Sequence, residues 1–292
     1  MGNRDEVKAF LSSRRAKITP EQAGLATYSR NRRVPGLRRS EVADLAGVSV
    51  EYYAQLERGD LRGVSDSVLD ALARALQLDE AERAHLVDLA HAAGPAARVR
   101  RKPPAQQVRP SVARILDGMT EVPAFVYNGR LDVLAANPLA AALFAPMLAD
   151  PARPANSARF NFLNPRARDF WRDWDRIASD TVAMMRTEAG RDPYDKALTD
   201  LVGELSTRSE DFRTRWAAHD VRLHRTGIKQ FHHPVVGDLD LNFETMHLTA
   251  DPGLAMTLLS APAGSAHDDA LRLLASWAAT RHTDAPTIPP RP

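Results

Sequence analysis

The chain has 292 residues, of which 44% are hydrophobic and 26% charged, and these globular values exclude wholesale disorder. No apolar run approaches 18 residues, which excludes a membrane-spanning helix, and the absence of cysteine excludes disulfides and thiolate metal sites. Residues 1–110 hold 19 basic and 14 acidic residues, whereas the remainder holds 20 basic and 23 acidic ones. This uneven charge predicts that only the first part of the chain meets a polyanion.

Residues 1–95 are predicted to form a helical domain. Residues 5–17 have the apolar spacing of an amphipathic helix, and residues 37–93 keep a helical pattern that glycines interrupt. Asp79 and Glu82 have the spacing of a capping box at the start of the last of these helices.

Within this domain, residues 39–58, RSEVADLAGVSVEYYAQLER, fit the template of a helix-turn-helix. Ala43 supplies the small residue that two steeply crossing helices need, and Gly47 tolerates the positive φ of the turn. Ser49 is placed to cap the second helix and Gly59 to stop it. The core-facing positions are apolar or aromatic: Val42, Ala46, Val48, Tyr53 and Leu56. An ordinary helical hairpin has no need of this combination, so the pattern favours a DNA-binding motif.

The stretch LAGVSVEYYAQLERG resembles the phage-repressor-like XRE family, and its flanks resemble a subset common in actinobacteria. The resemblance covers residues 5–93 and implies a five-helix domain whose second motif helix enters the major groove of a double-stranded DNA operator. It implies base contacts, with adenine, cytosine or thymine edges, by Ser49, Val50, Glu51 and Gln55. It implies phosphate contacts at the rim by Arg39, Tyr52, Arg58 and Arg62. Arg38 stands where relatives often have Thr and is a further candidate contact.

Residues 96–110 are rich in proline and basic residues and are predicted to be a linker, followed by a second domain at 111–282 and a disordered tail at 283–292. The second domain opens with a helix, SVARILDGM, and two strand-like runs, PAFVYN and LDVLAAN. A helix is expected from Pro138, a helical insertion over residues 166–221, and then the strand-like runs IKQFHH, LDLNFETMHL and LAMTLLSA. Residues 268–280 form a last helix. This order predicts a PAS-like antiparallel sheet closed by helices around a pocket.

Stretches such as VPAFVYNGRLDVLAANPLAAALFAP and HDVRLHRTGIKQFHHPVVGDLDL are similar to the ligand-binding domain of MmyB-like regulators. The similarity covers most of residues 110–280 and implies a pocket for a small apolar ligand, with a fatty acid as the ligand type associated with the family. The predicted lining residues are Phe125, Tyr127, Phe162, Trp174, Met184, Phe231 and Phe243. The predicted partners of a carboxylate head group are Arg222, His224 and His233. The alternative is that the aromatic residues are only core and that Arg222 pairs with neighbouring acidic residues.

The adjacent His232 and His233 do not form a metal site, because neighbouring side chains of a strand point to opposite faces. The sequence has no nucleophile elbow, phosphate loop or dinucleotide fingerprint, so neither an enzyme nor a bound cofactor is expected. Two alternatives stay open. A PAS-like cofactor-binding or enzymatic protein with an attached DNA-binding module would show a visible absorption band. An antitoxin or architectural protein that senses nothing would have a filled second core.

The sequence therefore predicts a multidomain protein of α and α+β class, in which a five-helix DNA-binding domain precedes a PAS-like sensor. The predicted function is sequence-specific, ligand-responsive transcription regulation. A homodimer is expected, because one helix-turn-helix offers too small a contact for specific binding at physiological salt. The charged N-terminus lacks the core of a signal peptide, which favours a cytoplasmic location.

Overall fold

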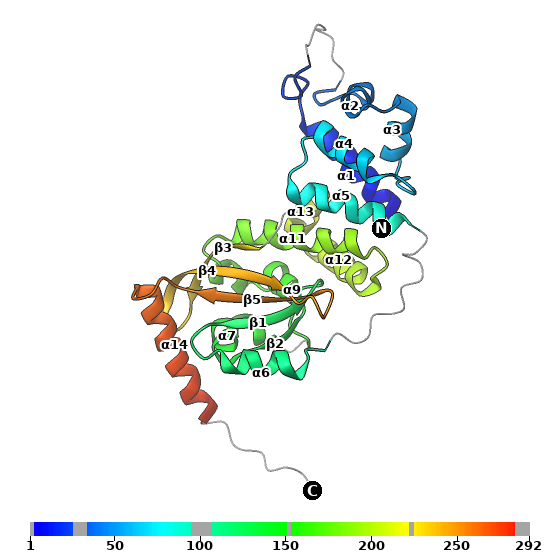
Figure 1. Cartoon of the computed structure of the whole chain (residues 1–292). Coiled ribbons are helices and arrows are strands. Elements are labelled where there is room, and N and C mark those ends of the chain that lie inside the picture. Colours follow the sequence, from blue (N-terminus) through cyan, green and yellow to red (C-terminus); the bar gives the residue numbers. More distant parts are fainter. Residues whose placement is uncertain (1–2, 26–33, 95–106, 151–152, 222–224, 284–292) are drawn as a thin grey trace. The chain divides into compact units, whose positions relative to one another are not determined.

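The computed structural model describes residues 3–25, 34–94, 107–150, 153–221 and 225–283 (Figure 1). Its internal contacts divide the chain into two compact units. The helical unit comprises the described residues up to 94 together with residues 182–221, and the sheet unit comprises residues 107–181 and 225–283. This division differs from the predicted domain boundaries over residues 182–221, which the sequence assigns to the second domain.

The described residues up to 94 form the five helices predicted for a DNA-binding domain. These helices are α1 (Asn3–Lys17), α2 (Arg39–Ala46), α3 (Val50–Glu57), α4 (Asp66–Ala75) and α5 (Glu80–Ala93). Their apolar faces share one core, in which Phe10, Leu56 and Leu86 are fully buried. The amphipathic spacing read from the sequence is therefore the spacing that fills this core.

Local hydrogen bonds fix where these helices begin. The Ser65 hydroxyl accepts a hydrogen bond from the backbone N–H of Val68 at the start of α4. The predicted capping box at α5 is confirmed: the Asp79 carboxylate accepts from the N–H of Glu82 at 2.8 Å, and the Glu82 carboxylate accepts from the N–H of Asp79 at 3.1 Å. Each pair satisfies backbone donors that have no partner within the helix.

Three further helices form the described part of the helical insertion from residue 174 onward. They are α11 (Trp174–Arg191), α12 (Lys196–Arg208) and α13 (Glu210–Ala217). Residues 182–191 of α11, with all of α12 and α13, belong to the helical unit, whereas residues 174–181 belong to the sheet unit. The structure confirms that this stretch is helical but divides it between the two units.

The sheet unit is built on an antiparallel sheet whose described strands follow the order β2-β1-β5-β4-β3. The strands are β1 (Ala124–Asn128), β2 (Val133–Ala136), β3 (Thr226–His233), β4 (Gly237–His247) and β5 (Leu254–Ser260). Phe125 pairs with Thr257 and Tyr127 with Ala255, so the first and last strands lie side by side at the centre. This arrangement confirms the predicted antiparallel sheet with helices.

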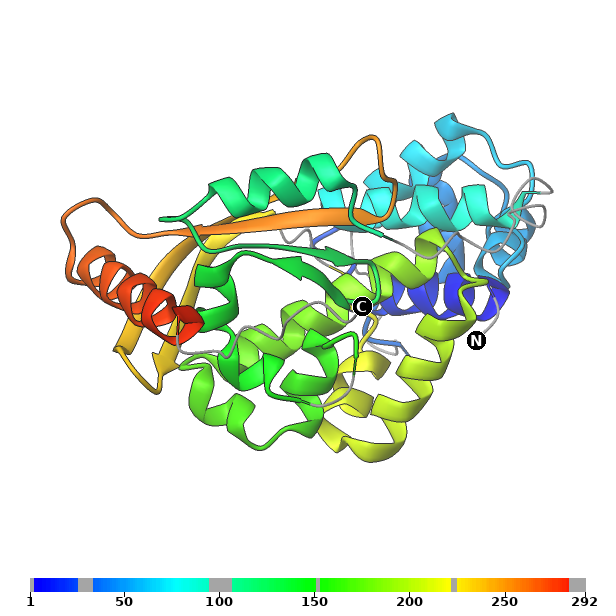
Figure 2. The same cartoon turned by 90° about the horizontal axis from the view of Figure 1, so that it is seen from below.

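Helices cover both faces of this sheet. Val112 of α6 (Pro110–Gly118) packs with Val126 and Met256 on one face. The opposite face holds Phe125 and Leu259, because successive side chains of a strand alternate in direction. That second face is covered by α7 (Pro138–Leu143), α8 (Ala145–Leu148), α9 (Ser157–Leu163), α10 (Arg166–Phe170), the first residues of α11, and α14 (Ala266–Thr283). Figure 2 shows α6 as the blue-green helix along one side of the strands.

Asn137 joins β2 to α7 and is fully buried. Its side-chain oxygen accepts from the backbone N–H of Ala140, which caps α7, and from that of Ala124 on β1. Its amide nitrogen donates to the carbonyls of Met119 and Val122, each at 2.7 Å. One polar side chain therefore fixes a helix start, a strand and the loop before it, with its donors and acceptor satisfied.

Candidate nucleic-acid interface and ligand-binding core

Helices α2 and α3 form the predicted helix-turn-helix. Gly47 ends α2 with a φ of 66°, in the left-handed region that favours glycine. The Ser49 hydroxyl then accepts a hydrogen bond from the backbone N–H of Tyr52 at 3.1 Å and caps α3. Ala43 and Tyr53 are fully buried, so these two helices cross closely and present the opposite side of α3 to solvent.

The residues predicted to contact DNA lie together on that exposed side and at its edges. Ser49, Val50, Glu51 and Gln55 are exposed along α3, and Tyr52 is half-buried. Arg38 and Arg39 are exposed at the start of α2, and Arg58 and Arg62 are exposed after α3. A helix with an exposed polar row and arginines at its flanks has the chemistry to reach base edges and phosphates together.

Asp60 connects a predicted base contact to a predicted phosphate contact. Its carboxylate accepts a hydrogen bond from the Gln55 amide at 3.2 Å and another from Arg62 Nε at 3.0 Å. These hydrogen bonds, that from Arg62 first, lower the pKa of Asp60 below its ordinary value. The sequence reading did not identify Asp60, although its position directly after the motif was a usable signal.

Glu57 connects α3 to the two helices before it. The carboxylate is almost fully buried and pairs with Arg15 of α1 at 2.7 Å and with Arg39 of α2 at 2.7 Å. Arg15 also donates to the carbonyl of Leu37, directly before α2. Arg39 is therefore held in an ion pair on its inner side, while its side chain is 56% exposed on the outer side.

The sheet unit contains the aromatic core expected of a ligand-binding domain. Phe231 lies at its centre, 4.9 Å from the Trp171 ring and 5.8 Å from the Phe144 ring by centroid distance. Asn161 holds the two tryptophans, because its side-chain oxygen accepts from Trp171 Nε1 and its carbonyl from Trp174 Nε1. The predicted lining residues that belong to this cluster or pack against it are Phe125, Phe162, Trp174, Phe231 and Phe243.

Two predicted residues add polar groups to the same sheet unit. Tyr127 is buried, and this burial raises the pKa of its phenol against the opposing effect of hydrogen bonding with Thr257 and Thr245. His233 is buried with both ring nitrogens occupied: Nδ1 accepts from the N–H of Val235 and Nε2 lies 3.2 Å from the carbonyl of Ala142. Burial lowers the pKa of His233, which favours the neutral form of its ring.

One predicted ligand contact lies outside this cluster, and two more fall outside the described residues. Met184 lies on the part of α11 that belongs to the helical unit, because the insertion is divided between residues 181 and 182. Arg222 and His224 fall outside the described residues, and their predicted pairing with a carboxylate stays a prediction.

Lys229 is a charged group that the sequence reading missed. It lies two residues before Phe231 on β3, so it points to the same face of the sheet as Phe231, the face that holds the aromatic cluster. Its ammonium group lies 4.6 Å from the centroid of the Phe243 ring and 5.7 Å from that of Trp171. Burial lowers the pKa of Lys229 to about 8, against the opposing effect of Asp180. A lysine within a strand ordinarily indicates a solvated position, so no local signal marked it.

No group of three or more potential metal ligands lies together among the residues that the structure describes. In the same part of the chain, no helix combines the length and the apolar character needed to cross a membrane.

The two units together define a helix-turn-helix transcription regulator with a ligand-binding domain. The family model described as the MmyB-like transcription regulator ligand binding domain matches residues 108–274, more than half of the chain. The chain therefore belongs to this family. A second model, described as a helix-turn-helix domain, matches residues 14–86. No curated protein matches the chain.

Proposed function

We propose that this regulator reads a specific operator through α3 and changes its operator affinity when a fatty acid binds in the sheet unit. The observation that carries the proposal is the exposed side of α3, where Gln55 and Glu51 point to solvent between arginines at both edges. The apolar core of the sheet unit supports the second half of the proposal.

In the operator complex, the exposed side of α3 lies in the major groove. Gln55 is suited to adenine and Glu51 to the amino group of cytosine, whereas Val50 packs on a thymine methyl group. Arg38, Arg39, Arg58 and Arg62 contact phosphates and give affinity without sequence preference. The chain binds as a homodimer across two half-sites about one helical turn apart.

A fatty acid is the effector that best suits the core of the sheet unit. Burial of about twelve methylenes yields roughly 10 kcal/mol gross, and the loss of translational and chain freedom leaves a micromolar ligand. The carboxylate then needs a cation on the face of the sheet that holds the aromatic cluster. Lys229 supplies such a charge among the Trp171 and Phe243 rings, whereas burial lowers the pKa of the predicted His233 and so disfavours its charged form.

Operator selection and lipid analysis test the two halves separately. Wild-type chain should enrich one motif from a randomised DNA pool, and its affinity should fall with salt with a log–log slope near −5, the value for about six phosphates. Mass spectrometry of lipids that co-purify with the chain should show fatty acids, and replacing Lys229 by Met should favour the matching fatty alcohol over the acid. A flat salt response rejects the DNA half, and equal binding of acid and alcohol by wild type rejects the head-group role.

A further inference from the structure

Part of the sensor sequence is built into the unit that holds the helix-turn-helix. Residues 182–221 lie inside the stretch 108–274 that matches the ligand-binding family, yet they pack in the helical unit. There they contact α1 and α5, two helices that lie far from residues 182–221 in the sequence. We call residues 182–221 the docking segment.

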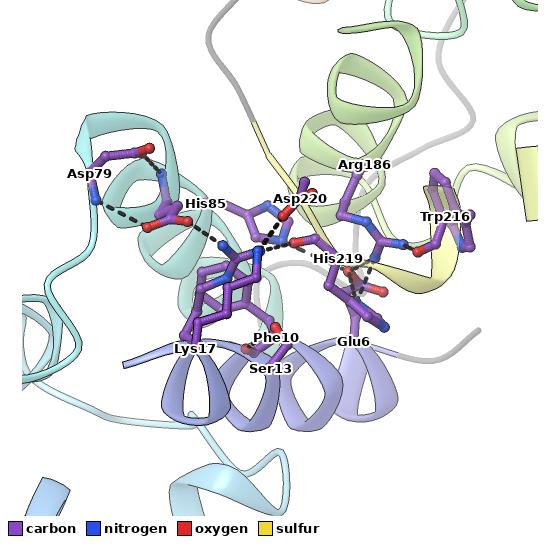
Figure 3. Close-up of polar contacts among 12 residues, drawn as sticks. Glu6, Phe10, Ser13, Lys17, Asp79, His85, Arg186, Trp216, His219 and Asp220 are labelled. Carbon is purple, nitrogen blue, oxygen red and sulfur yellow. Dashed lines mark hydrogen bonds and ion pairs between the residues drawn. The ribbon is translucent and has the colours of Figure 1, made fainter. Parts of the chain in front are cut away.

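Arg186 makes the central contact of the docking segment. The side chain is fully buried on α11 and donates to the Glu6 carboxylate of α1 and to the backbone carbonyl of Trp216 on α13. Its guanidinium also lies 4.1 Å from the centroid of the Trp216 ring, and its Nη1 lies 2.9 Å from His219 Nδ1 (Figure 3). One guanidinium therefore joins α1, α11 and α13.

A second group of contacts lies two turns further along α1. Arg14 is buried and donates to the Glu82 carboxylate of α5 and to the backbone carbonyl of His219. Lys17, in the last turn of α1, pairs with Asp220 (Figure 3). Arg14 also donates to the Asp220 carboxylate, at 3.4 Å. The docking segment is thus attached along most of the length of α1.

The third contact is a close approach between two helices. Gly190 on α11 faces the ring of His85 on α5, and a Cβ at residue 190 would lie 2.4 Å from ring atom Cε1 and 2.6 Å from Nδ1. His85 is fully buried and also meets the Phe10 ring edge-on at 5.0 Å. Any side chain at residue 190 therefore requires the buried His85 ring, or the two helices that carry Gly190 and His85, to shift.

Helix α1 also contacts the DNA-reading helices. Arg15, next to Arg14, pairs with Glu57 at the end of α3 and donates to the carbonyl of Leu37 before α2. Contacts with the docking segment and with the helix-turn-helix therefore meet on adjacent residues of one helix. A shift of α1 at Arg14 also moves Arg15 and its ion pair with Glu57, because the two arginines lie in the same helical turn.

The other end of α11 belongs to the sensor core. Trp174, Ile177 and Ala178 are buried in the aromatic cluster of the sheet unit, and Trp174 is a proposed ligand contact. A continuous helix transmits a rotation or translation along its axis. A ligand that repacks Trp174 therefore acts on the same helix that carries Arg186 and Gly190.

The chemistry of the docking contacts suits reversible attachment. Buried charges such as those of Glu6 and Arg186 gain attraction but lose hydration, so a buried ion pair contributes little net stability compared with apolar packing. When the segment separates, water restores the hydration of both groups. A purely apolar interface would regain no such hydration when the segment separates.

We propose that the docking segment is the regulatory element of this protein: when it is docked on α1 and α5 it holds α3 in the operator-binding arrangement, and when it separates, operator binding weakens. The proposal rests on the proposed function, because it assigns the route by which the sheet unit acts on DNA. Couplings of this kind typically change affinity by about 5–150-fold.

A glycine-to-alanine pair in the full-length chain tests the proposal. Gly190→Ala places a Cβ against His85, whereas Gly203→Ala on α12 meets no atom within 4 Å and serves as the matched control. Gly190→Ala should raise hydrogen exchange of the α1 and α5 amides and weaken binding to the wild-type-selected operator about tenfold, within the usual range for such couplings. Gly203→Ala should behave as wild type. Faster exchange without loss of operator affinity overturns the proposal.

A second variant strengthens docking instead of weakening it. It keeps the proposal testable if Gly190→Ala folds poorly. Glu6→Leu combined with Arg186→Met replaces the buried ion pair by apolar side chains, an exchange that often preserves or increases stability. Exchange at α1 should slow and operator affinity should stay at or above that of wild type. Slower exchange with weaker operator binding overturns the proposal. Failure of the proposed function appears differently, as a wild-type chain that prefers no DNA sequence.

Discussion

The Gln55 amide donates a hydrogen bond to the Asp60 carboxylate, 3.2 Å away, so this side chain is held in place before any DNA arrives. A side chain already fixed in a suitable position loses less conformational freedom when it binds. The same carboxylate also holds Arg62, on the other side of the turn that follows α3.

Gln55→Ala should relax sequence preference at one base pair of each half-site. The bidentate contact of an amide with adenine is worth about 1–3 kcal/mol of discrimination, which the variant loses. The measurement is binding to a library in which every operator position is varied. A uniform loss across the library would show that Gln55 does not read a base.

Arg62→Ala should weaken binding to all DNA sequences alike and reduce the salt slope by about one, because it removes one phosphate contact. Affinities for the operator and for shuffled DNA, measured at several salt concentrations, check this. Arg272→Ala is the control, since this exposed arginine lies on α14 of the sheet unit, outside both the helix-turn-helix and the docking segment. A change of preferred base in Arg62→Ala would contradict the assignment.

Glu57→Ala should destabilise the helical unit by about 3 kcal/mol, because removing one partner leaves Arg15 half-buried without its carboxylate. Denaturant unfolding of the full chain, followed by exchange at α3 amides, measures the loss. Glu51→Ala on the exposed side of the same helix is the matched control and should leave stability nearly unchanged. Equal stability of the two variants would show that the Glu57 pairs are not structural.

Asn137→Ala should destabilise the sheet unit by about 3 kcal/mol. The variant leaves two backbone N–H groups and two carbonyls without their present partner in a buried position, and each such loss is costly. Thermal unfolding monitored by tryptophan fluorescence reports on this unit through Trp171 and Trp174. Asn164→Ala, at the end of α9, supplies a comparison at a helix terminus. A loss below about 1 kcal/mol would contradict the prediction.

Acidification should destabilise the helical unit in two steps. Burial lowers the pKa of His85 from 6.5 to about 4, so the unfolded chain takes up this proton first and stability falls as the pH drops from 6.5 towards 4. Burial alone would raise the pKa of Glu6, but the hydrogen bond with His219 and the contacts with Arg186 outweigh it and lower the pKa from 4.5 to about 2. The Glu6 contribution is therefore complete above pH 4.5 and is lost between pH 4.5 and about 2.

The pH dependence can be assigned with variants of one helix. His85→Phe removes the group that titrates between pH 6.5 and 4, and the free energy of unfolding should then fall less over this window, by at most about 1.4 kcal/mol per pH unit. His91→Gln changes an exposed histidine of α5 and should keep the wild-type slope. Equal slopes in wild type and His85→Phe would show that His85 does not titrate as described.

Much of the fold, including the helix-turn-helix, could be predicted, because the signals are local. Gly47, Ser49 and the Asp79–Glu82 pair act within one turn, so their spacing in the sequence is enough to place them. The placement of the docking segment could not be predicted, since Glu6 and Arg186 are 180 residues apart and neither has a local signature. The buried position of Lys229 could not be predicted for a related reason: its aromatic neighbours, Trp171 and Phe243, lie outside β3.

The helical unit is assembled from two stretches of chain. The predicted linker at 96–110 is therefore not a point at which the DNA-binding and ligand-binding parts can be exchanged between homologous proteins. A crossover there, the simplest way to graft a new DNA-binding head onto an old sensor, would set foreign α1 and α5 residues against Arg186 and Gly190. In such a chimera Arg186 would lose its partner Glu6, and Gly190 would face a side chain other than His85. Heads and sensors of this architecture are therefore expected to be inherited as matched pairs.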